Sequence, residues 1–327
     1  MATSEQIKAL LKSYSESDDS RFFAVAMQIA AHEARIGHGS LAKELRAIID
    51  EAKSSRKSPL IQKGATPIFR PQGELSTLLS VSFPKTRLSD MVLNDPVAVR
   101  LIRIIKEQRK ILEIRSHGLL PRRKLLLLGP PGTGKTMTAS ALAGELGLPL
   151  FVTRLDGVIT KYMGETSAKL RLIFEALKKN RGVYLFDEFD SIGSTRVLTN
   201  DVGEMRRILN SFLQLTDEDE SESLILSATN HPDILDHALY RRFDDILEYS
   251  LPDREARMML IQNRLAIHQE NLEFGDLADA AEELSHAELT RACDDVIKDM
   301  VINDRSTYAN KDVLRMIGER QRIQEKS

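Results

Sequence analysis

Short, continuous apolar runs alternate with helical spacing of apolar residues through the middle of the chain. Such runs are typical of strands buried on both faces, and the helices between them cover a parallel sheet. The pattern therefore predicts an α/β domain over residues 86–250, with helices on both faces of the sheet. The predicted strands are residues 125–128, 150–153, 183–186, 224–227 and 246–249.

Helical patterns without strands occupy the two ends of the chain. After Pro252 they predict a helical subdomain over residues 251–327, with helices over residues 256–269, 286–303 and 311–321. Three short amphipathic stretches predict a helical module over residues 1–52, too small to bury a thick core alone. Residues 53–85 are rich in serine and proline, so we predict a linker there, with a short strand near residues 78–81.

Composition narrows the class of protein. The chain has 327 residues, 42% hydrophobic and 29% charged, as in soluble globular proteins. Its 46 Lys and Arg against 48 Asp and Glu argue against general nucleic-acid binding. The single cysteine, Cys293, excludes an internal disulfide framework and a cysteine-rich zinc site. No signal-peptide pattern and no apolar run of roughly 20 residues occurs, so we expect a cytoplasmic protein without a membrane span.

A glycine-rich string, GPPGTGKT at residues 129–136, follows the first run of the central domain and opens a helical pattern. This strand–loop–helix context predicts a phosphate-binding loop, whose backbone N–H groups and helix N-terminus attract phosphate oxygens. We expect Lys135 to reach the β- and γ-phosphates of a nucleotide and the Thr136 hydroxyl to bind Mg²⁺. The predicted nucleotide-binding residues are Gly129, Pro130, Pro131, Gly132, Thr133, Gly134, Lys135, Thr136 and Met137.

Polar residues follow two further strands of the predicted sheet. Asp187 and Glu188 come directly after residues 183–186, where ligands bind in open α/β sheets. We expect Asp187 to hold Mg²⁺ and Glu188 to act as the general base for the attacking water. Asn230 follows the next strand and either orients the water or γ-phosphate or forms a turn. The pair Arg241 and Arg242 is either a solvated, salt-bridged pair or a pair of arginine fingers for a neighbouring subunit's nucleotide.

The order of these strings resembles the AAA branch of the AAA+ ATPases from about Thr86 to the C-terminus. The matching strings are DEFDSI at residues 187–192, SATN at 227–230 and RRFD at 241–244, the arginine pair being most similar to the katanin, spastin and vesicle-sorting group. The resemblance implies a P-loop NTPase fold of the ASCE class with a helical lid. It also implies Walker A, Walker B, sensor 1 and finger roles for, respectively, Lys135 and Thr136, Asp187 and Glu188, Asn230, and Arg241 and Arg242.

One string bears on how ATP hydrolysis would be used. Lys161, Tyr162 and Met163 resemble the first pore loop of AAA unfoldases, in which an aromatic side chain grips an extended polypeptide. A tyrosine packed in the core is the alternative. His286 stands where the family has a glycine near the adenine, and the acidic run at residues 217–222, longer than the family's turn, is interpreted as a solvated loop.

The resemblance therefore predicts an ATP- and Mg²⁺-dependent ATPase that forms a homo-oligomer, a hexamer, and remodels or threads protein substrates. A nucleotide-driven switch acting on a partner protein is the alternative. The stretch from Phe22 to His38 is similar to bacterial AAA ATPases encoded beside subtilisin-like proteases, which makes such a protease the candidate partner. A nucleic-acid motor is disfavoured by the near-neutral charge.

Overall fold

The computed structural model describes residues 25–27, 29–30, 47–48, 71–154, 158, 163–188, 202–231, 240–265 and 272–324. The chain divides into two compact units, Met1–Phe69 and Arg70–Ser327. The described residues of the first unit are helical. Most of the predicted N-terminal module lies outside the described residues.

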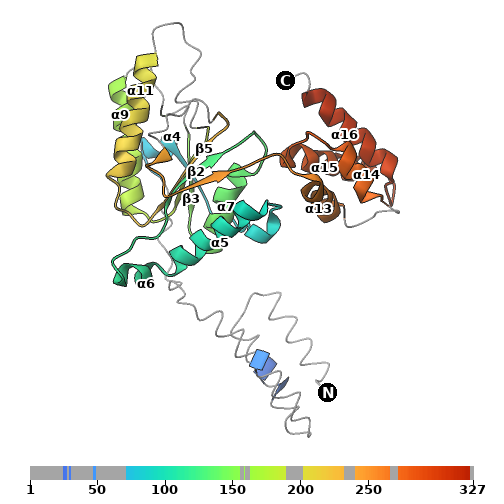
Figure 1. Ribbon diagram of the computed structural model, residues 1–327, viewed down its shortest axis with the longest axis horizontal. Coiled ribbons are helices and arrows are strands. Elements are labelled where there is room, and N and C mark those ends of the chain that lie inside the picture. Colours follow the sequence, from blue (N-terminus) through green and yellow to red (C-terminus); the bar gives the residue numbers. More distant parts are fainter. Residues whose placement is uncertain are drawn as a thin grey trace. The chain divides into compact units, whose positions relative to one another are not determined.

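The second unit is built on a sheet with strand order β1-β3-β4-β5-β2-β6. The five predicted strands are confirmed, and all of them pair in parallel (Figure 1). β1 pairs antiparallel with β3 at one edge, which the apolar runs did not predict. The strands are β1 (Leu79–Ser82), β2 (Lys124–Leu128), β3 (Leu150–Thr153), β4 (Val183–Phe186), β5 (Leu224–Thr229) and β6 (Asp245–Glu248).

The sheet takes in the end of the segment predicted as a linker. The strand expected near residues 78–81 is β1, and the short helix α4 (Leu75–Leu78) precedes it. Leu78 and Leu79 are buried, so this segment contributes to the core. Pro71 and Pro84 lie outside the two elements, where a missing N–H group does not interrupt the ladder.

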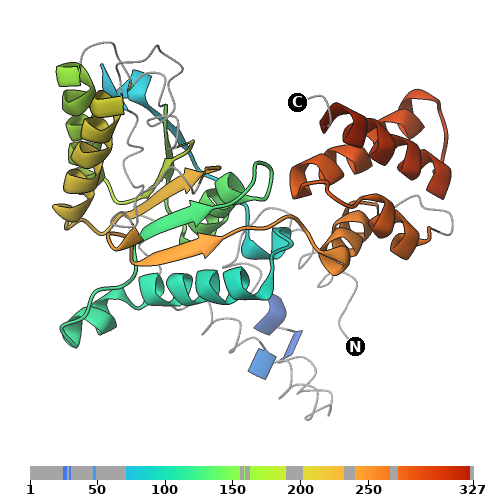
Figure 2. The same ribbon diagram turned by 45° about the horizontal axis from the view of Figure 1, so that its top comes forward.

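Helices cover both faces of the sheet, as predicted (Figures 1 and 2). Alternate residues of β4 show the two layers: Val183 and Leu185 belong to the core formed with α5 and α7. Phe186 points to the other face, where its ring stacks with Phe174 of α9 and meets Phe212 of α11 edge-on. The covering helices are α5 (Asp95–Arg109), α6 (Ile111–Ser116), α7 (Lys135–Leu146), α9 (Met163–Lys179) and α11 (Val202–Asp217), with the 3-10 turn η1 (Leu88–Asp90) before α5.

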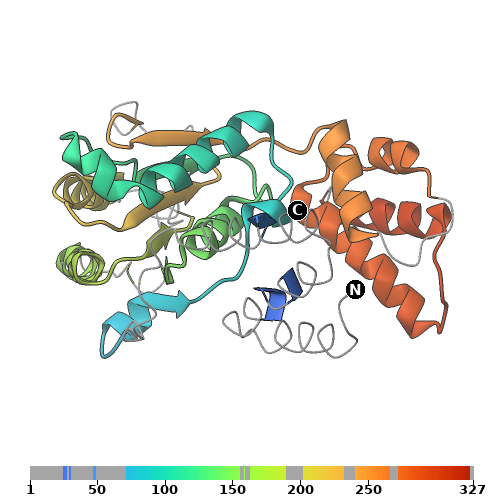
Figure 3. The ribbon, with the colours of Figure 1, turned by 90° about the horizontal axis from the view of Figure 1, so that it is seen from below.

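Four helices after β6 pack around a core of their own, which we call the lid (Figure 3). They are α13 (Arg254–Arg264), α14 (Phe274–Ala280), α15 (His286–Ile302) and α16 (Asn310–Gln324). The side chains of Asp253 and Ser285 cap the N-termini of α13 and α15. None of the helices in the described ranges is long and apolar enough to cross a membrane.

Candidate active site

The glycine-rich loop connects β2 to α7, as predicted, and two of its glycines stand where a side chain has no room: Gly129 against a backbone oxygen and Gly132 against a side chain. A Cβ on Gly129 would lie 2.2 Å from the carbonyl oxygen of Tyr249, and one on Gly132 would lie 2.5 Å from the Ser285 hydroxyl. Both glycines also have a positive φ. The N–H of Ala287 donates to the Gly132 carbonyl at 3.0 Å, so the loop contacts the first turn of lid helix α15 directly.

The charged end of Lys135 lies inside the curve of this loop. Its Nζ donates to the carbonyl oxygens of Gly129 and Pro130, at 2.6 and 2.7 Å, and the residue is only 6% exposed. The Thr133 hydroxyl donates to the same Pro130 oxygen at 2.8 Å. These contacts hold a positive charge at the mouth of the loop, where phosphate oxygens are bound in P-loop proteins.

The two residues predicted to hold Mg²⁺ lie in contact. The Thr136 hydroxyl donates to the Asp187 carboxylate at 2.6 Å, although Thr136 lies in the first turn of α7 and Asp187 follows β4. One hydroxyl and one carboxylate are the hard oxygen donors that Mg²⁺ takes from proteins when phosphates and water supply the rest. The donor set therefore fits this ion.

Glu188 adopts a left-handed backbone conformation, with φ of 50°. This is rare for a residue with a side chain and costs of order 1 kcal/mol or more. The backbone N–H of Glu188 donates to the Asp187 carboxylate at 3.0 Å, which helps to hold the turn. Strain concentrated at the predicted general base was not evident from the sequence.

Asn230 lies at the same edge of the sheet as these residues. β5 lies between β4 and β2, and the register pairs Phe186 with Ser227 and Leu128 with Thr229. The carboxyl ends of the three strands are therefore neighbours. The structure brings Asn230 and the two acidic residues together with the phosphate loop.

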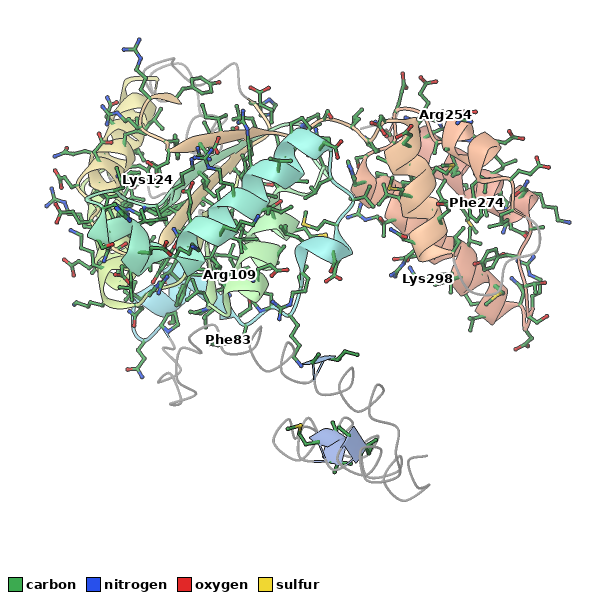
Figure 4. The ribbon with its side chains drawn as sticks, turned by 60° about the horizontal axis from the view of Figure 1, so that its bottom comes forward. Phe83, Arg109, Lys124, Arg254, Phe274 and Lys298 are labelled. Atoms are coloured by element: carbon green, nitrogen blue, oxygen red, sulfur yellow. The ribbon has the colours of Figure 1, made fainter. Side chains whose placement is uncertain are left out.

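Arg241 and Arg242 lie at the opposite ends of the strands, just before β6 and beside the amino end of β2. The turn that contains them is fixed by Asp244, whose carboxylate accepts from the N–H groups of Arg123 and Lys124 at the start of β2. Figure 4 shows Lys124 on the side of the α/β subdomain away from the lid. The glycine-rich loop begins after the five residues of β2, about 16 Å further along at 3.3 Å per residue.

The acidic run at residues 217–222 is not simply a solvated loop, as the sequence had suggested. Asp219 is buried and forms an ion pair with Arg123, while Glu222 pairs with Arg115 and Arg181. Asp217 pairs with Arg242 at 2.8 Å. The local sequence does not indicate these ion pairs, because the partners come from four other segments of the chain.

Tyr249 is a site residue that the sequence analysis missed. Its buried hydroxyl hydrogen-bonds to the Thr138 hydroxyl in α7 at 2.6 Å, and burial raises the pKa of Tyr249. The residue follows β6 directly and precedes the lid, so this contact joins the helix of the phosphate loop to the segment that leads into the lid. The one signal in the sequence was a hydroxyl group at the end of an apolar run.

A cavity of about 320 Å³ adjoins the loop at Thr133. Its walls come from the segment after η1, from Tyr249 and from the lid, and they include Val92, Met259 and His286. Burial lowers the pKa of His286, against the opposing effects of a hydrogen bond to the Val92 backbone and of Asp253. A partly apolar cavity of this size lies at the lower end of the range of small-molecule sites.

The structure describes one of the three residues of the predicted pore loop. Lys161 and Tyr162 lie outside the described residues. Met163 is the first residue of α9. Their role in gripping substrate stays a prediction.

Comparisons with known proteins identify the family of this chain. The sequence profile of the ATPase family associated with various cellular activities (AAA) matches residues 125–251. An uncharacterized AAA family ATPase of Sinorhizobium fredii, y4kL, is 35% identical over 319 residues, which cover 97% of this chain and 95% of the relative. The chain is an AAA family ATPase. Its membership supports the predicted ATP hydrolysis.

Two further likenesses concern parts of the ATPase. A proteasome-activating nucleotidase of Methanoregula boonei is 34% identical over 209 residues, 61% of this chain and 48% of the relative. The crystal structure of the FIGL-1 AAA domain superposes with a TM-score of 0.59 and 24% identity, over 73% of this chain and 85% of that one. The second likeness shows that the P-loop NTPase fold is shared.

Proposed function

We propose that this ATPase works as a ring, hydrolyses ATP at the interface between neighbouring subunits and uses the energy to remodel or thread proteins. The observation that carries the proposal is the separation of the arginine pair from the phosphate loop by the length of β2. This distance exceeds the reach of any side chain. Arg241 and Arg242 therefore have no access to the nucleotide of their own subunit, but they are available to that of a neighbour.

Within one subunit, the residues at the carboxyl edge divide the work. Lys135 exchanges the carbonyl oxygens of Gly129 and Pro130 for phosphate oxygens when the nucleotide binds. Thr136 and Asp187 would hold Mg²⁺, which neutralises part of the charge on the β- and γ-phosphates. Glu188 accepts a proton from the attacking water, and Asn230 orients that water.

The next subunit would complete the site. Guanidinium groups stabilise the charge that develops on a transferring phosphoryl group, an effect worth several orders of magnitude in rate. An interface that joins the carboxyl ends of the strands in one subunit to the arginine pair of the next is head-to-tail, and such contacts form a ring when the rotation between subunits closes. From the family resemblance we propose that the ring is a hexamer.

A protein substrate is favoured by the string from Lys161 to Met163 and by one relative. That relative is a nucleotidase that activates the proteasome, and its name connects an ATPase of this family with protein degradation. An aromatic side chain at the pore suits many substrates because its apolar and stacking contacts need no particular sequence.

The proposal is tested by measuring ATP turnover against protein concentration. Turnover per subunit should rise steeply as subunits assemble, and Glu188→Gln should remove it at every concentration. For the mechanical role, Tyr162→Ala should abolish ATP-driven unfolding of a fluorescent model substrate, while Tyr162→Phe should keep it. Unfolding that survives Tyr162→Ala would favour the buried-tyrosine alternative.

The alternative function, a switch acting on a partner such as a subtilisin-like protease, gives different results. Partner binding would then follow the bound nucleotide, and hydrolysis would be dispensable. Capture with Glu188→Gln and ATP separates the two, because a threading enzyme retains unfolded clients and a switch retains one folded partner. DNA-stimulated turnover with sharp salt dependence would instead indicate a nucleic-acid motor.

A further inference from the structure

Asp217, the last residue of α11, contacts one of the two arginines assigned to the neighbouring subunit's nucleotide. Its Oδ2 lies 2.8 Å from Nη1 of Arg242. The two side chains are 47% and 37% exposed, so the pair lies at the surface and is not enclosed in the core. A surface pair of this kind contributes little to stability.

Helix stability does not explain an acid at this position. The C-terminal end of a helix carries a partial negative charge, which disfavours carboxylates and favours basic residues. The last turn of α11 has no basic residue and ends in Asp217, which another acid, Glu218, follows. The carboxylate at the end of this helix is therefore stabilised from outside, by Arg242.

The segment after α11 is fastened to the body of the subunit. The buried carboxylate of Asp219 accepts from the guanidinium of Arg123, whose other amino group donates to the Asp219 carbonyl oxygen. The Ser221 hydroxyl also donates to the Asp219 carboxylate, at 3.1 Å. Because Arg123 directly precedes β2, this anchor fixes Asp217 at the same edge of the sheet as Arg242.

The contact also leaves most of the Arg242 guanidinium available. An arginine has five N–H donors in a planar fork, and Asp217 contacts one of its amino groups. The long side chain loses considerable rotamer freedom when it binds a phosphate. A carboxylate that already restricts the rotamer reduces this loss without covering the whole fork.

We propose that Asp217 is a positioning residue, which orients Arg242 toward the nucleotide of the adjacent subunit. The inference rests on the proposed trans role of the arginine pair. This role gives the acidic segment at residues 217–222 a function: Asp219 anchors the segment to Arg123, and Asp217 contacts Arg242.

The test is steady-state ATP hydrolysis by the full chain at a protein concentration that saturates assembly. Asp217→Asn should lower kcat about threefold to tenfold and leave KM unchanged, since Asp217 acts on the finger and not on nucleotide binding. Asp217→Glu, which keeps the carboxylate, should recover most of the rate. Glu220→Gln is the matched control, because it removes the same charge from an exposed neighbour and should leave kcat unchanged.

A double-mutant comparison shows whether Asp217 acts through Arg242. Arg242→Ala should lower kcat further than Asp217→Asn, and the combined variant should be no slower than Arg242→Ala alone. An equal additional loss in the Arg242→Ala background would overturn the proposal, because Asp217 would then act on the fold. An unchanged or raised kcat in Asp217→Asn would also overturn it, a raised one identifying Asp217 as a restraint on the finger.

The same data separate this proposal from the proposed function. If Arg242→Ala lowers kcat and Asp217→Asn does not change it, the trans finger stands and the positioning role is wrong. If Arg242→Ala keeps the full rate, the finger assignment fails and the positioning role fails with it.

Discussion

Two helical glycines should respond in opposite directions to the same substitution. Gly144 lies in α7, the helix that begins at the phosphate loop, and a Cβ there would lie 2.0 Å from the carbonyl oxygen of Thr86. Gly318 lies inside α16 of the lid, and a Cβ there would meet nothing within 4 Å. Alanine is the better helix former by about 1 kcal/mol, so helix propensity alone favours both substitutions.

At Gly144 the surrounding atoms turn the expected gain in stability into a loss. The atom in the way belongs to the backbone, so α7 and the segment through Thr86 must move apart, at a cost of about 1–3 kcal/mol or more. The movement also lengthens the 2.7 Å hydrogen bond from Arg87 Nη1 to the Gly144 carbonyl. A Cβ 2.0 Å from a backbone oxygen belongs at the upper end of this range, about 2–3 kcal/mol, and the helix-propensity gain of about 1 kcal/mol offsets part of it. We expect Gly144→Ala to lose about 1–2 kcal/mol of unfolding free energy and Gly318→Ala to gain about 0.5–1 kcal/mol.

Urea unfolding followed by circular dichroism measures both changes. The two variants should move the midpoint in opposite directions from that of the parent chain. Nucleotide affinity offers a second readout, because a shift of α7 carries Lys135 and Thr136 with it. A Gly144→Ala protein as stable as Gly318→Ala would refute the close approach between α7 and Thr86.

Three further residues allow simpler tests. Tyr249→Phe should cost about 1 kcal/mol, since the Thr138 hydroxyl loses its buried partner, and adding Thr138→Val should cost little more in the same urea assay. Because the pKa of His286 is lowered, the unfolded chain takes up the proton first below about pH 6.5, and the protein loses stability as the pH is lowered. Thermal melts of His286→Gln should show a weaker dependence of stability on pH, and an unchanged dependence would assign it to other groups. Burial raises the pKa of the Cys293 thiol to about 12, so a thiol reagent should react with this cysteine only after the lid opens or unfolds, and rapid labelling of the native chain would contradict its burial.

The elements that the sequence predicted best were those with a simple physical signature. The five parallel strands are continuous apolar runs because both faces of the sheet are covered. The phosphate loop was recognisable because its glycines, Lys135 and Thr136 stand between a strand and a helix. β1 as an edge strand and the short helix α14 lack such a signature: each has few residues and only one or two buried side chains.

What could not be predicted depends on pairs that are distant in the chain. The partners of Asp217 and Asp219 lie 25 residues later and 96 residues earlier, respectively, and nothing in either local sequence indicates them. The same holds for the contact of Gly132 with Ser285 and for the hydrogen bond between Thr138 and Tyr249. These contacts follow from the order of the strands and the return of the lid to the loop.

Mixing two inactive variants tests completion of the active site by a neighbour most directly. Glu188→Gln keeps the arginine pair but lacks the general base, and a chain carrying both Arg241→Ala and Arg242→Ala keeps the base but lacks the fingers. Each alone should be inactive, while an equal mixture should regain about a quarter of the wild-type rate, because about one interface in four joins an intact base to intact fingers. The account would be contradicted by a mixture that stays inactive after subunit exchange. It would also be contradicted if the variant with Arg241→Ala and Arg242→Ala, by itself, hydrolysed ATP at the wild-type rate.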